Sequence, residues 1–465
     1  MTLEMKRWIV AVLGILFLAG LLIVGWVEGG KRRFVEKPEP VAGGDSKACV
    51  DCHRQKSPAL VAQWADSRHA AVGVSCFECH AAGDNDPDAF LHEGKRIATV
   101  PTPIDCARCH ADQTAEFMAS HHAKAAKFIG SLDNILGEIV EGHLAAANGC
   151  QQCHGSTVAL VKDAGGELRR EKDGRPVLDP LTWPNTGIGR VNLDGSLGTC
   201  TACHTRHTFS RAQARQPEVC GKCHMGPDHP QIEIYTESKH GIVYAARKAE
   251  MNLESPSWVV GRDYDAAPTC ATCHMSATRN QPVTHDVGAR ISWTLRPVVS
   301  TKLEKWEDRR RAMQDVCSAC HAPDFVSAFY RQFDGTIELY NEKFAKPAQK
   351  LMGALRAAKK ITPTPFDDEI EWTFYHLWHH EGRRARMGVS MQGPDYTQWH
   401  GFFEVAHRFY FELLPKAREL GAGDAGFAKA LAEVEAMTEH RWLKGMTQSD
   451  IESIERFYRE RYGKP

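Results

Sequence analysis

Apolar and polar residues follow three patterns along this chain. Trp8 to Val27 is an uncharged apolar run of twenty residues, and at about 1.5 Å per residue it is long enough to cross a bilayer as one helix. From Ile370 to Met387 and from Trp399 to Leu414 apolar residues recur at helical spacing. The part between is rich in turns, for example at residues 182–198. We expect a mainly α fold: an N-terminal transmembrane helix, a loop-rich domain and a C-terminal helical domain.

The N-terminal run is expected to remain as a membrane anchor. Lys6 and Arg7 precede it, and it ends in Gly25-Trp26-Val27-Glu28 without the small-residue pattern of a cleavage site. A cleaved signal peptide is the alternative. Residues 1–28 are therefore predicted to be an anchor or signal, and residues 29–45, which are rich in proline and glycine, to be a tether.

Every cysteine of the chain belongs to a Cys-x-x-Cys-His motif. The pattern is typical of c-type cytochromes, where two thiols bind haem covalently and the histidine binds its iron. With sixteen cysteines and none left over, disulfides and zinc sites are poor alternatives. The predicted cofactors are eight covalent haems. The eight motifs are Cys49/Cys52/His53, Cys76/Cys79/His80, Cys106/Cys109/His110, Cys150/Cys153/His154, Cys200/Cys203/His204, Cys220/Cys223/His224, Cys270/Cys273/His274 and Cys317/Cys320/His321.

The motifs also predict where the protein resides and how it is divided. Haem is joined to such thiols outside the cytoplasmic membrane, so the body of the chain is expected at the periplasmic face, anchored by its N-terminus, or free in the periplasm if the run is cleaved. We place the haem domain at residues 46–325 and the helical domain at 326–465. Fifty-seven basic and fifty-eight acidic residues give no charge bias that would suggest a nucleic-acid partner.

The helical domain offers two more local predictions. Its final helix is expected to start at the capping pattern Ser449-x-x-Glu452 and to stop near Gly463. Aromatic residues cluster between 402 and 411 in greater number than one helix core needs, which favours a subunit interface over a simple cap on the haem domain. The residues concerned are Phe402, Phe403, Phe409, Tyr410 and Phe411.

Histidines outside the motifs are numerous enough to serve as second axial ligands. Twenty-three histidines less the eight in the motifs leave fifteen, so counting alone does not prove an open iron. Asp228 and His229 directly follow the sixth motif and place a carboxylate beside an imidazole. Such a pair is equipped to move protons. The alternative is that Asp228 caps a turn and His229 is a distal haem ligand, and spacing alone does not separate the two.

From residue 45 to about 415 the chain resembles the octahaem hydroxylamine oxidoreductase family. The resemblance rests on the order of the eight motifs, on Cys-His-Thr-Arg-His at 203–207, on Gly-x-Asp-His at 226–229 and on Ser-Lys-His-Gly at 238–241. It implies that the fourth motif carries a catalytic haem without a distal protein ligand, and that Asp228 and His229 are active-site residues. It also implies a helical fold, commonly a trimer. The implied distal ligands are His69, His92, His122, His207, His240 and His285, and the seventh is open between His379 and His380.

One departure from the family bears on the direction of the reaction. Oxidising members have a tyrosine that crosses to a neighbouring subunit and bonds to the catalytic haem. Matching without a gap puts Asp395 at its place, and a one-residue gap puts Tyr396 there. A second family tyrosine falls on Phe329 or Tyr330. Members without the cross-link resemble reductases, so reduction of nitrite or hydroxylamine toward ammonium is slightly favoured over hydroxylamine oxidation. A non-catalytic electron conduit is the third interpretation.

The expected partners follow from this resemblance and from the apolar run. They are a small nitrogen compound as substrate, a cytochrome or quinol-linked membrane protein as redox partner, the membrane itself and two further copies of the chain.

Overall fold

The computed structural model describes residues 47–130 and 135–463. The predicted anchor and the predicted tether lie outside these residues. No helix within the described ranges is long and apolar enough to cross a membrane. The chain forms two compact units, residues 1–210 and 211–465, and this division falls between the fifth and sixth motifs. The change from a haem domain to a helical domain near residue 325 stays a prediction. The fold is mainly α-helical and loop-rich, as predicted.

The first unit consists of short helices joined by loops. Its strands β1 (Ala89–His92) and β2 (Lys95–Ala98) pair antiparallel, with Ala89 opposite Ala98. Short elements suit a chain whose cysteine motifs interrupt any long apolar period. The helices are α2 (Lys47–Lys56), α3 (Pro58–Ala65), α4 (Arg68–Ala71), α5 (Cys76–His80), α6 (Pro103–Ala107), α7 (Ala111–Ala119), η1 (His122–Gly130), η2 (Ile135–Gly142), α9 (His143–Asn148), α10 (Cys150–His154) and η3 (Cys200–Ala202).

The second unit begins with short elements like those of the first. Strands β3 (Trp293–Thr294) and β4 (Thr301–Lys302) form a two-stranded sheet. A cluster around the buried Trp258, Tyr264 and Met251 packs this part. The helices are α11 (Arg211–Ala214), α12 (Pro217–Gly221), α13 (Gln231–Glu237), α14 (Lys239–Arg247), η4 (Lys248–Met251), α15 (Cys270–His274) and α16 (Trp306–Cys317).

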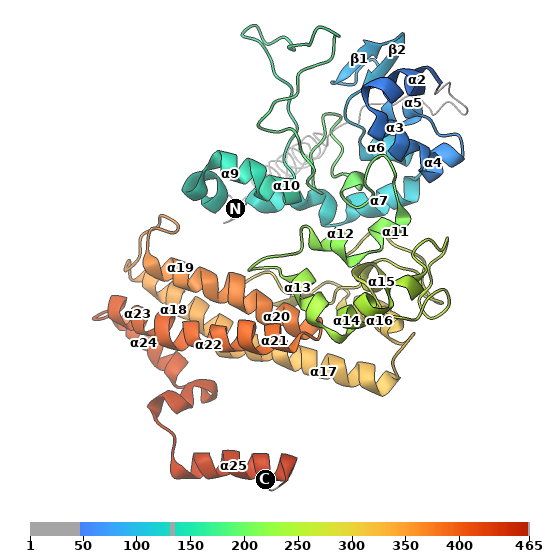
Figure 1. Cartoon of the computed structure of the whole chain (residues 1–465). Coiled ribbons are helices and arrows are strands. Elements are labelled where there is room, and N and C mark those ends of the chain that lie inside the picture. The colour runs from blue at the N-terminus through green and yellow to red at the C-terminus, as the bar shows by residue number, and fades with distance from the viewer. Residues whose placement is uncertain (1–46, 131–134, 464–465) are drawn as a thin grey trace, which may run out of the picture. The chain divides into compact units, whose positions relative to one another are not determined.

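Long helices then take over, and Figure 1 shows them side by side in yellow and orange. The two predicted helical stretches lie inside continuous helices at 369–390 and 394–420, each interrupted by π-turns that insert an extra residue without ending the helix. The elements are α17 (Pro323–Tyr340), η5 (Asn341–Ala345), α18 (Lys346–Ala357), α19 (Glu369–Tyr375), η6 (His376–Glu381), α20 (Gly382–Ser390), α21 (Pro394–Thr397), η7 (Gln398–Phe403), α22 (Glu404–His407), η8 (Arg408–Leu413), α23 (Leu414–Leu420), α24 (Ala425–Glu435), η9 (Thr438–Lys444) and α25 (Gln448–Tyr462).

The final helix stops where predicted but starts at a different cap. Thr447 accepts a hydrogen bond from the backbone of Asp450, whose carboxylate in turn accepts one from the Thr447 backbone, so the capping box is Thr447–Asp450 and not Ser449–Glu452. Both pairs have residue types that can form a capping box. Thr447 is the cap because Gly445, at φ +94°, turns the chain just before it.

The aromatic residues between 402 and 411 divide between core and surface. Phe409 and Tyr410 are buried, whereas Phe403 and Phe411 are more than half exposed. Phe409 is fully buried, stacks on His440 and meets the ring of Phe344 edge-on. The core of the helical part therefore accounts for only some of these aromatics, and the interface remains a prediction for the exposed ones.

Phe409→Ala should destabilise the second unit by about 3 to 5 kcal/mol, because it leaves a cavity where a large ring was fully buried. The matched control Phe411→Ala, two residues along the same helix, removes a ring that is 67% exposed and should change stability by less than about 0.5 kcal/mol. Denaturant unfolding followed by helical circular dichroism measures both. Equal effects of the two substitutions would contradict the packing described.

Candidate haem sites and the Asp228–His229 pair

Several cysteine motifs fold as single helical turns. α5, α10 and α15 each run from the first cysteine of a motif to its histidine. Residues three and four apart lie on one helix face, so both thiols and the imidazole emerge on the same side. All sixteen cysteines lie in the described residues and none forms a disulfide. This is the disposition that covalent haem attachment requires.

The fifth motif is less regular than these. The 3₁₀ helix η3 begins at Cys200 and ends at Ala202, so Cys203 and His204, both predicted to bind haem, lie outside any helix. The turn is closed by two backbone hydrogen bonds to the carbonyl oxygen of Cys200, one of 3.2 Å from Cys203 and one of 3.0 Å from His204. The backbone therefore still folds into a turn, but the roles of Cys203 and His204 rest on the motif and stay predictions.

Three motif cysteines differ from the others because they are exposed. They are Cys52, Cys109 and Cys320. Cys52 lies in α2, which has no buried residue, and Cys109 lies in the turn after α6. By contrast, burial raises the pKa of Cys273 to about 12. The protein does not enclose Cys52 and Cys109 in this way, so haem joined there would have an edge open to solvent. Their part in haem attachment also stays a prediction from the motif.

Two motif histidines have a fixed tautomer. The Nδ1 atom of His80 lies 2.9 Å from the carbonyl oxygen of Ala98, and that of His274 lies 3.1 Å from the carbonyl oxygen of Val287. Nδ1 must donate to a carbonyl, so Nε2 keeps its lone pair for a metal. Burial, foremost, lowers the pKa of both imidazoles. Each is thus held in the neutral form that binds iron.

Three motif histidines face another histidine at nearly the same distance. The ring centroids of His53 and His92 are 6.2 Å apart, those of His110 and His69 are 6.2 Å apart, and those of His321 and His240 are 6.1 Å apart. An iron bound on both sides by imidazole separates the ring centres by roughly 6 Å. The spacing of these pairs therefore fits a haem iron held between them.

The other predicted distal ligands are placed less sharply. His207 lies close enough to His80 for the second imidazole to lower its pKa, although burial lowers it more. His122 begins η1, and His285 lies in the loop that leads to Val287; both are half-buried. Their part in iron binding stays a prediction.

Thiols of different motifs meet within each unit. A hydrogen bond joins Cys106 of the third motif to Cys200 of the fifth and raises the pKa of Cys106. A hydrogen bond likewise joins Cys220 of the sixth motif to Cys270 of the seventh and raises the pKa of Cys220. Because haem edges would attach at these sulfur atoms, haems bound there would be close neighbours.

The fourth motif, on α10, is held by an unusually close loop. A Cβ atom added at Gly155, which has φ +85°, would lie 2.4 Å from the backbone nitrogen of Arg190, and one at Gly187 would lie 2.1 Å from the backbone nitrogen of Gly155. Only glycine fits such backbone contact. A small pocket beside this motif is lined by Leu144, Gln151, Gln152, Leu181 and Pro184, among others.

Asp228 is the centre of a polar cluster within the second unit. One carboxylate oxygen bonds Nδ1 of His229, and the other, Oδ2, accepts a hydrogen bond of 2.9 Å from Nη1 of Arg383. Nε2 of His379 lies 3.8 Å from Oδ2. Burial opposes ionisation of Asp228, but the bond and charge of His229, with the charges of His379 and Arg383, outweigh it and lower the pKa of Asp228 to about 2. The carboxylate is fixed as an anion.

The surroundings of His229 favour its protonated form. Burial lowers the pKa of this imidazole, but the hydrogen bond and charge of Asp228, and a further bond to the Cys223 backbone, raise it overall. Its ring centroid also lies 6.3 Å from that of His224, a motif histidine, so distance alone also fits a distal ligand. A ligand must be neutral, and two acceptors around the ring favour the protonated form.

Arg383 is a site residue that the motif analysis missed, and His379, one of the two candidates for the seventh distal haem ligand, lies beside the Asp228 carboxylate; the part of His379 or His380 in iron binding stays a prediction. They come from the long helix at 369–390, far along the chain from Asp228. Arg383 is anchored from behind, since its Nε donates to the carbonyl oxygen of Arg296 and its guanidinium lies over the Trp378 ring at 5.3 Å. The signal was present: positions 376, 379, 380 and 383 carry His, His, His and Arg and share one helix face.

Both candidate tyrosines have ordinary packing contacts. Tyr396, half-buried, lies with its ring 5.3 Å from that of His400, and burial raises its pKa. Tyr330 is buried in a cluster with Phe333 and Ile337, with the Arg310 guanidinium 4.5 Å from its ring centroid. Burial raises the pKa of Tyr330.

Two family models match parts of the chain. Residues 194–360 match a family described as seven times multi-haem cytochrome CxxCH, and residues 138–225 match cytochrome c7 and related cytochrome c. These matches, together with the motif geometry, indicate a multihaem cytochrome c with covalently bound haem iron.

Three relatives extend the comparison. A probable nitrite reductase-hydroxylamine oxidoreductase fusion protein of Kuenenia stuttgartiensis is 26% identical over 366 residues, which cover 68% of this chain and 38% of that protein. The chain thus spans little more than a third of that relative's length. A solved structure described as a hypothetical multiheme protein has a TM-score of 0.71 at 25% identity, covering 84% of this chain and 98% of the other. A reducing HAO-like protein complex of Kuenenia stuttgartiensis, at 20% identity and a TM-score of 0.59, covers 86% and 89% and shares the fold.

Asp228→Asn should destabilise the fold by about 2 kcal/mol at pH 7, because the carboxylate's pKa falls from its ordinary 3.8 to about 2 on folding. A carboxyl group whose pKa is lower in the folded state stabilises the fold at pH values above its pKa in the unfolded chain. The destabilisation caused by Asp228→Asn should therefore shrink as pH falls from about 4 to about 2. Denaturant unfolding against pH measures it. Asp308→Asn, at a carboxylate that is 64% exposed, is the control. A loss at Asp228 that does not vary with pH would contradict the account.

Proposed function

We propose that this protein is an octahaem c-type cytochrome of the hydroxylamine oxidoreductase type, which performs multi-electron redox chemistry on hydroxylamine or nitrite at one five-coordinate haem. The observation that carries the proposal is a half-buried Asp228–His229 pair, held by Arg383, in a chain with eight haem-attachment motifs. The printed name of the fusion relative, which joins nitrite reductase and hydroxylamine oxidoreductase, supports the substrate class.

The proposed haem ligands follow from the geometry of the histidine pairs. Each motif supplies two thioether links and one proximal imidazole. His92, His69 and His240 would complete the coordination of the first, third and eighth irons, and His207 that of the second; His122 and His285 are the further candidates. The iron bound by Cys150, Cys153 and His154 would stay open and supply substrate binding and electron transfer.

Asp228 and His229 are proposed to handle the protons. The anionic Asp228 holds Nδ1 of His229, so a proton passed to substrate leaves from Nε2. A pKa raised above the ordinary value keeps the imidazole protonated closer to neutral pH, which suits a general acid. The hydrogen bond and charge of His229, followed by His379 and Arg383, keep Asp228 ionised, so that the carboxylate orients His229 and does not itself take the proton.

Reduction toward ammonium is the favoured direction. Gapless matching puts Asp395 in the place of the cross-linking tyrosine, and Asp395 pairs with His400 at 3.4 Å. An N-terminal anchor at the periplasmic face of the cytoplasmic membrane would bring the body near a quinol-linked partner or a cytochrome. Assembly as a homotrimer is part of the same proposal.

A second candidate, a pure electron conduit, is favoured by one observation. The 6.3 Å spacing of His224 and His229 matches that of the three pairs assigned to iron. If His229 binds iron, the chain loses its proposed proton donor, and every haem can be six-coordinate.

His229→Ala should lower turnover of hydroxylamine or nitrite by about two to four powers of ten, because it removes the positioned acid, and Asp228→Asn should act in the same direction by freeing the ring. Haem content and low-spin signals should not change. His400→Ala, at a histidine that is half exposed and also paired with a carboxylate, is the control and should keep activity. Loss of low-spin intensity in His229→Ala would make His229 a ligand and favour the conduit.

Tyr396→Phe should leave the catalytic haem's absorption and the reductive rate nearly unchanged, since the proposed direction needs no cross-link. Optical spectra and rates with a low-potential donor measure this. A large spectral shift with collapse of hydroxylamine oxidation would establish the cross-link and reverse the direction.

A further inference from the structure

The final helix, α25, carries an apolar stripe that the described part of the chain leaves exposed. Its four members lie three, four and four residues apart, which places them on one face of the helix. Their exposed fractions run from 41% to 70%, and no residue of α25 is buried. Because packing of an apolar face is what normally stabilises a helix in a protein, α25 has the form of a helix that needs a partner. The stripe consists of Ile451, Ile454, Tyr458 and Tyr462.

The helix is nevertheless well formed. The capping box of Thr447 and Asp450 closes its first turn, and Asp450 also pairs at 2.9 Å with Arg441, which precedes the helix. Toward its end the rings of Tyr458 and Tyr462 stack with their centroids 5.8 Å apart. The stripe is therefore held as one continuous surface.

The charges of α25 are arranged in a mirror pattern about the middle of the helix. Three acidic residues lie in its first half, and each has an arginine at the mirror position in the second half. Two such helices laid antiparallel would bring the acidic residues of each to the arginines of the other, whereas a parallel pair would put like charges together. Glu460 alone departs from the pattern. The mirror pairs are Asp450 and Arg461, Glu452 and Arg459, and Glu455 and Arg456.

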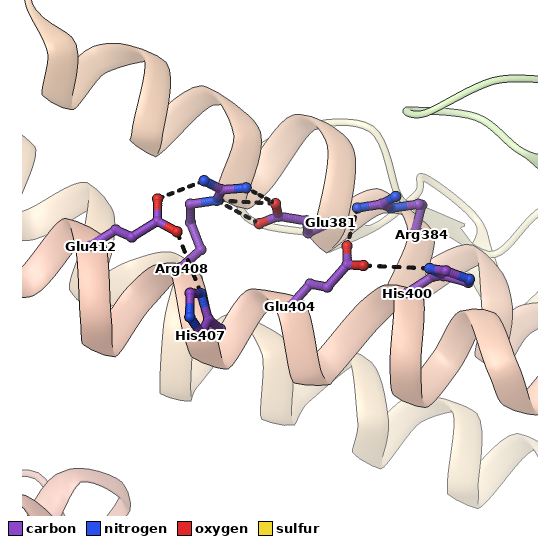
Figure 2. Close-up of polar contacts among 7 residues, drawn as sticks. All are labelled: Glu381, Arg384, His400, Glu404, His407, Arg408 and Glu412. Carbon is purple, nitrogen blue, oxygen red and sulfur yellow. Dashed lines mark hydrogen bonds and ion pairs between the residues drawn. The ribbon is translucent and has the colours of Figure 1, made fainter.

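The long helices show how this chain pairs charges where two of its own helices pack together. Figure 2 shows Arg408 bonded to the buried Glu381 across two neighbouring helices, at 2.6 Å. In α25, by contrast, Arg459 pairs with Glu455 of the same helix at 3.0 Å. Pairing of charges across a helix interface is thus a device of this fold, and α25 carries charges arranged for it.

We propose that α25 pairs antiparallel with α25 of a second copy of this chain. The stripes face each other, with Ile454 of each copy against the partner's Tyr458, and Glu452 of each copy lies beside the partner's Arg459. Both copies use the same surface, so the contact is isologous. It needs no haem and stands apart from the proposed function. Because it joins two copies, it differs from the three-fold contact of a trimer, and between trimers it would link one to another.

A membrane surface fits the stripe less well than a second copy does. Helices that lie in the membrane interface have polar faces rich in lysine and arginine. Within residues 448–462, α25 has four acidic residues, three arginines and no lysine. Anionic lipid therefore does not attract its polar face, whereas the mirror pattern gives a second copy charges of the opposite sign.

Ile454→Asp in the full-length haem-loaded protein, kept in a mild detergent, tests the apolar contact. It places a charge in the middle of each stripe and should weaken self-association roughly a hundredfold. Ser453→Asp is the matched control, because it adds the same charge one residue earlier, away from the stripe, and should leave association unchanged. Sedimentation velocity over a range of concentrations measures both. Where the wild type is paired, its mass should be twice that of Ile454→Asp.

Exchange of two charges tests the antiparallel direction. Glu452→Arg alone and Arg459→Glu alone should each weaken the pair roughly three- to tenfold, because each places like charges between the copies. The double variant restores opposite charges and should recover wild-type association. Within one helix, each change instead puts like charges four residues apart, beside Arg456 or Glu455. An effect on helix stability alone would therefore make the double variant the weakest.

Four results would overturn the inference. Equal masses of wild type and Ile454→Asp at every concentration would show that the stripe joins no copies. A mass ratio of three would assign it to a trimer. A double variant weaker than either single one would contradict the antiparallel arrangement. Binding to vesicles of phosphatidylethanolamine and phosphatidylglycerol that Ile454→Asp loses, with masses unchanged, would assign the stripe to the membrane. Turnover is expected to be the same in all these variants, so the proposed function is tested separately.

Discussion

The geometry of the Cys-x-x-Cys-His turn is the constraint on which the rest of this structure depends. A single turn brings two thiols and an imidazole to one side of the backbone, and the Nδ1 bonds of His80 and His274 to backbone carbonyls fix which nitrogen faces iron. A chain that must do this eight times cannot also maintain long amphipathic helices. The short elements of the first unit and the early second unit reflect this requirement, and long helices begin only as the motifs end.

The long helices also contribute to the polar cluster at Asp228. The helix at 369–390 presents His379 and Arg383 to this carboxylate. Burying Asp228 without partners would have raised its pKa and left it protonated. The hydrogen bond and charge of His229, followed by His379 and Arg383, reverse that outcome. Because the Nε of Arg383 is bound to the Arg296 carbonyl oxygen, this guanidinium cannot easily turn away. Stability and chemistry thus draw on the same ion pair.

Much of this could be predicted from the sequence, because the signals were local. The motifs, the helical class and the stop of the last helix near Gly463 follow from neighbouring residues. The Thr447 cap was missed because two overlapping patterns compete and only the turn at Gly445 decides between them. Arg383, and the place of His379 beside Asp228, were missed because these contacts join distant positions, 155 residues apart for Arg383.

The motif pattern also says nothing about how each copy is surrounded. All eight copies have the same five-residue form, yet Cys52 and Cys109 are exposed and Cys203 and His204 follow the end of a 3₁₀ helix. These differences come from the segments that pack around each motif. The choice of His240 as a distal ligand came from family resemblance, and its pairing with His321 came from the structure, since no local rule links a distal histidine to its haem.

The central claim is that one iron of eight lacks a protein ligand on its distal side. Resting-state EPR of the haem-loaded protein, recorded before and after addition of cyanide, tests it most directly. The account predicts a high-spin signal from a single haem that cyanide converts to low spin while the other signals stay unchanged. Low-spin signals from every haem, with no response to cyanide or hydroxylamine, would contradict it and leave an electron conduit.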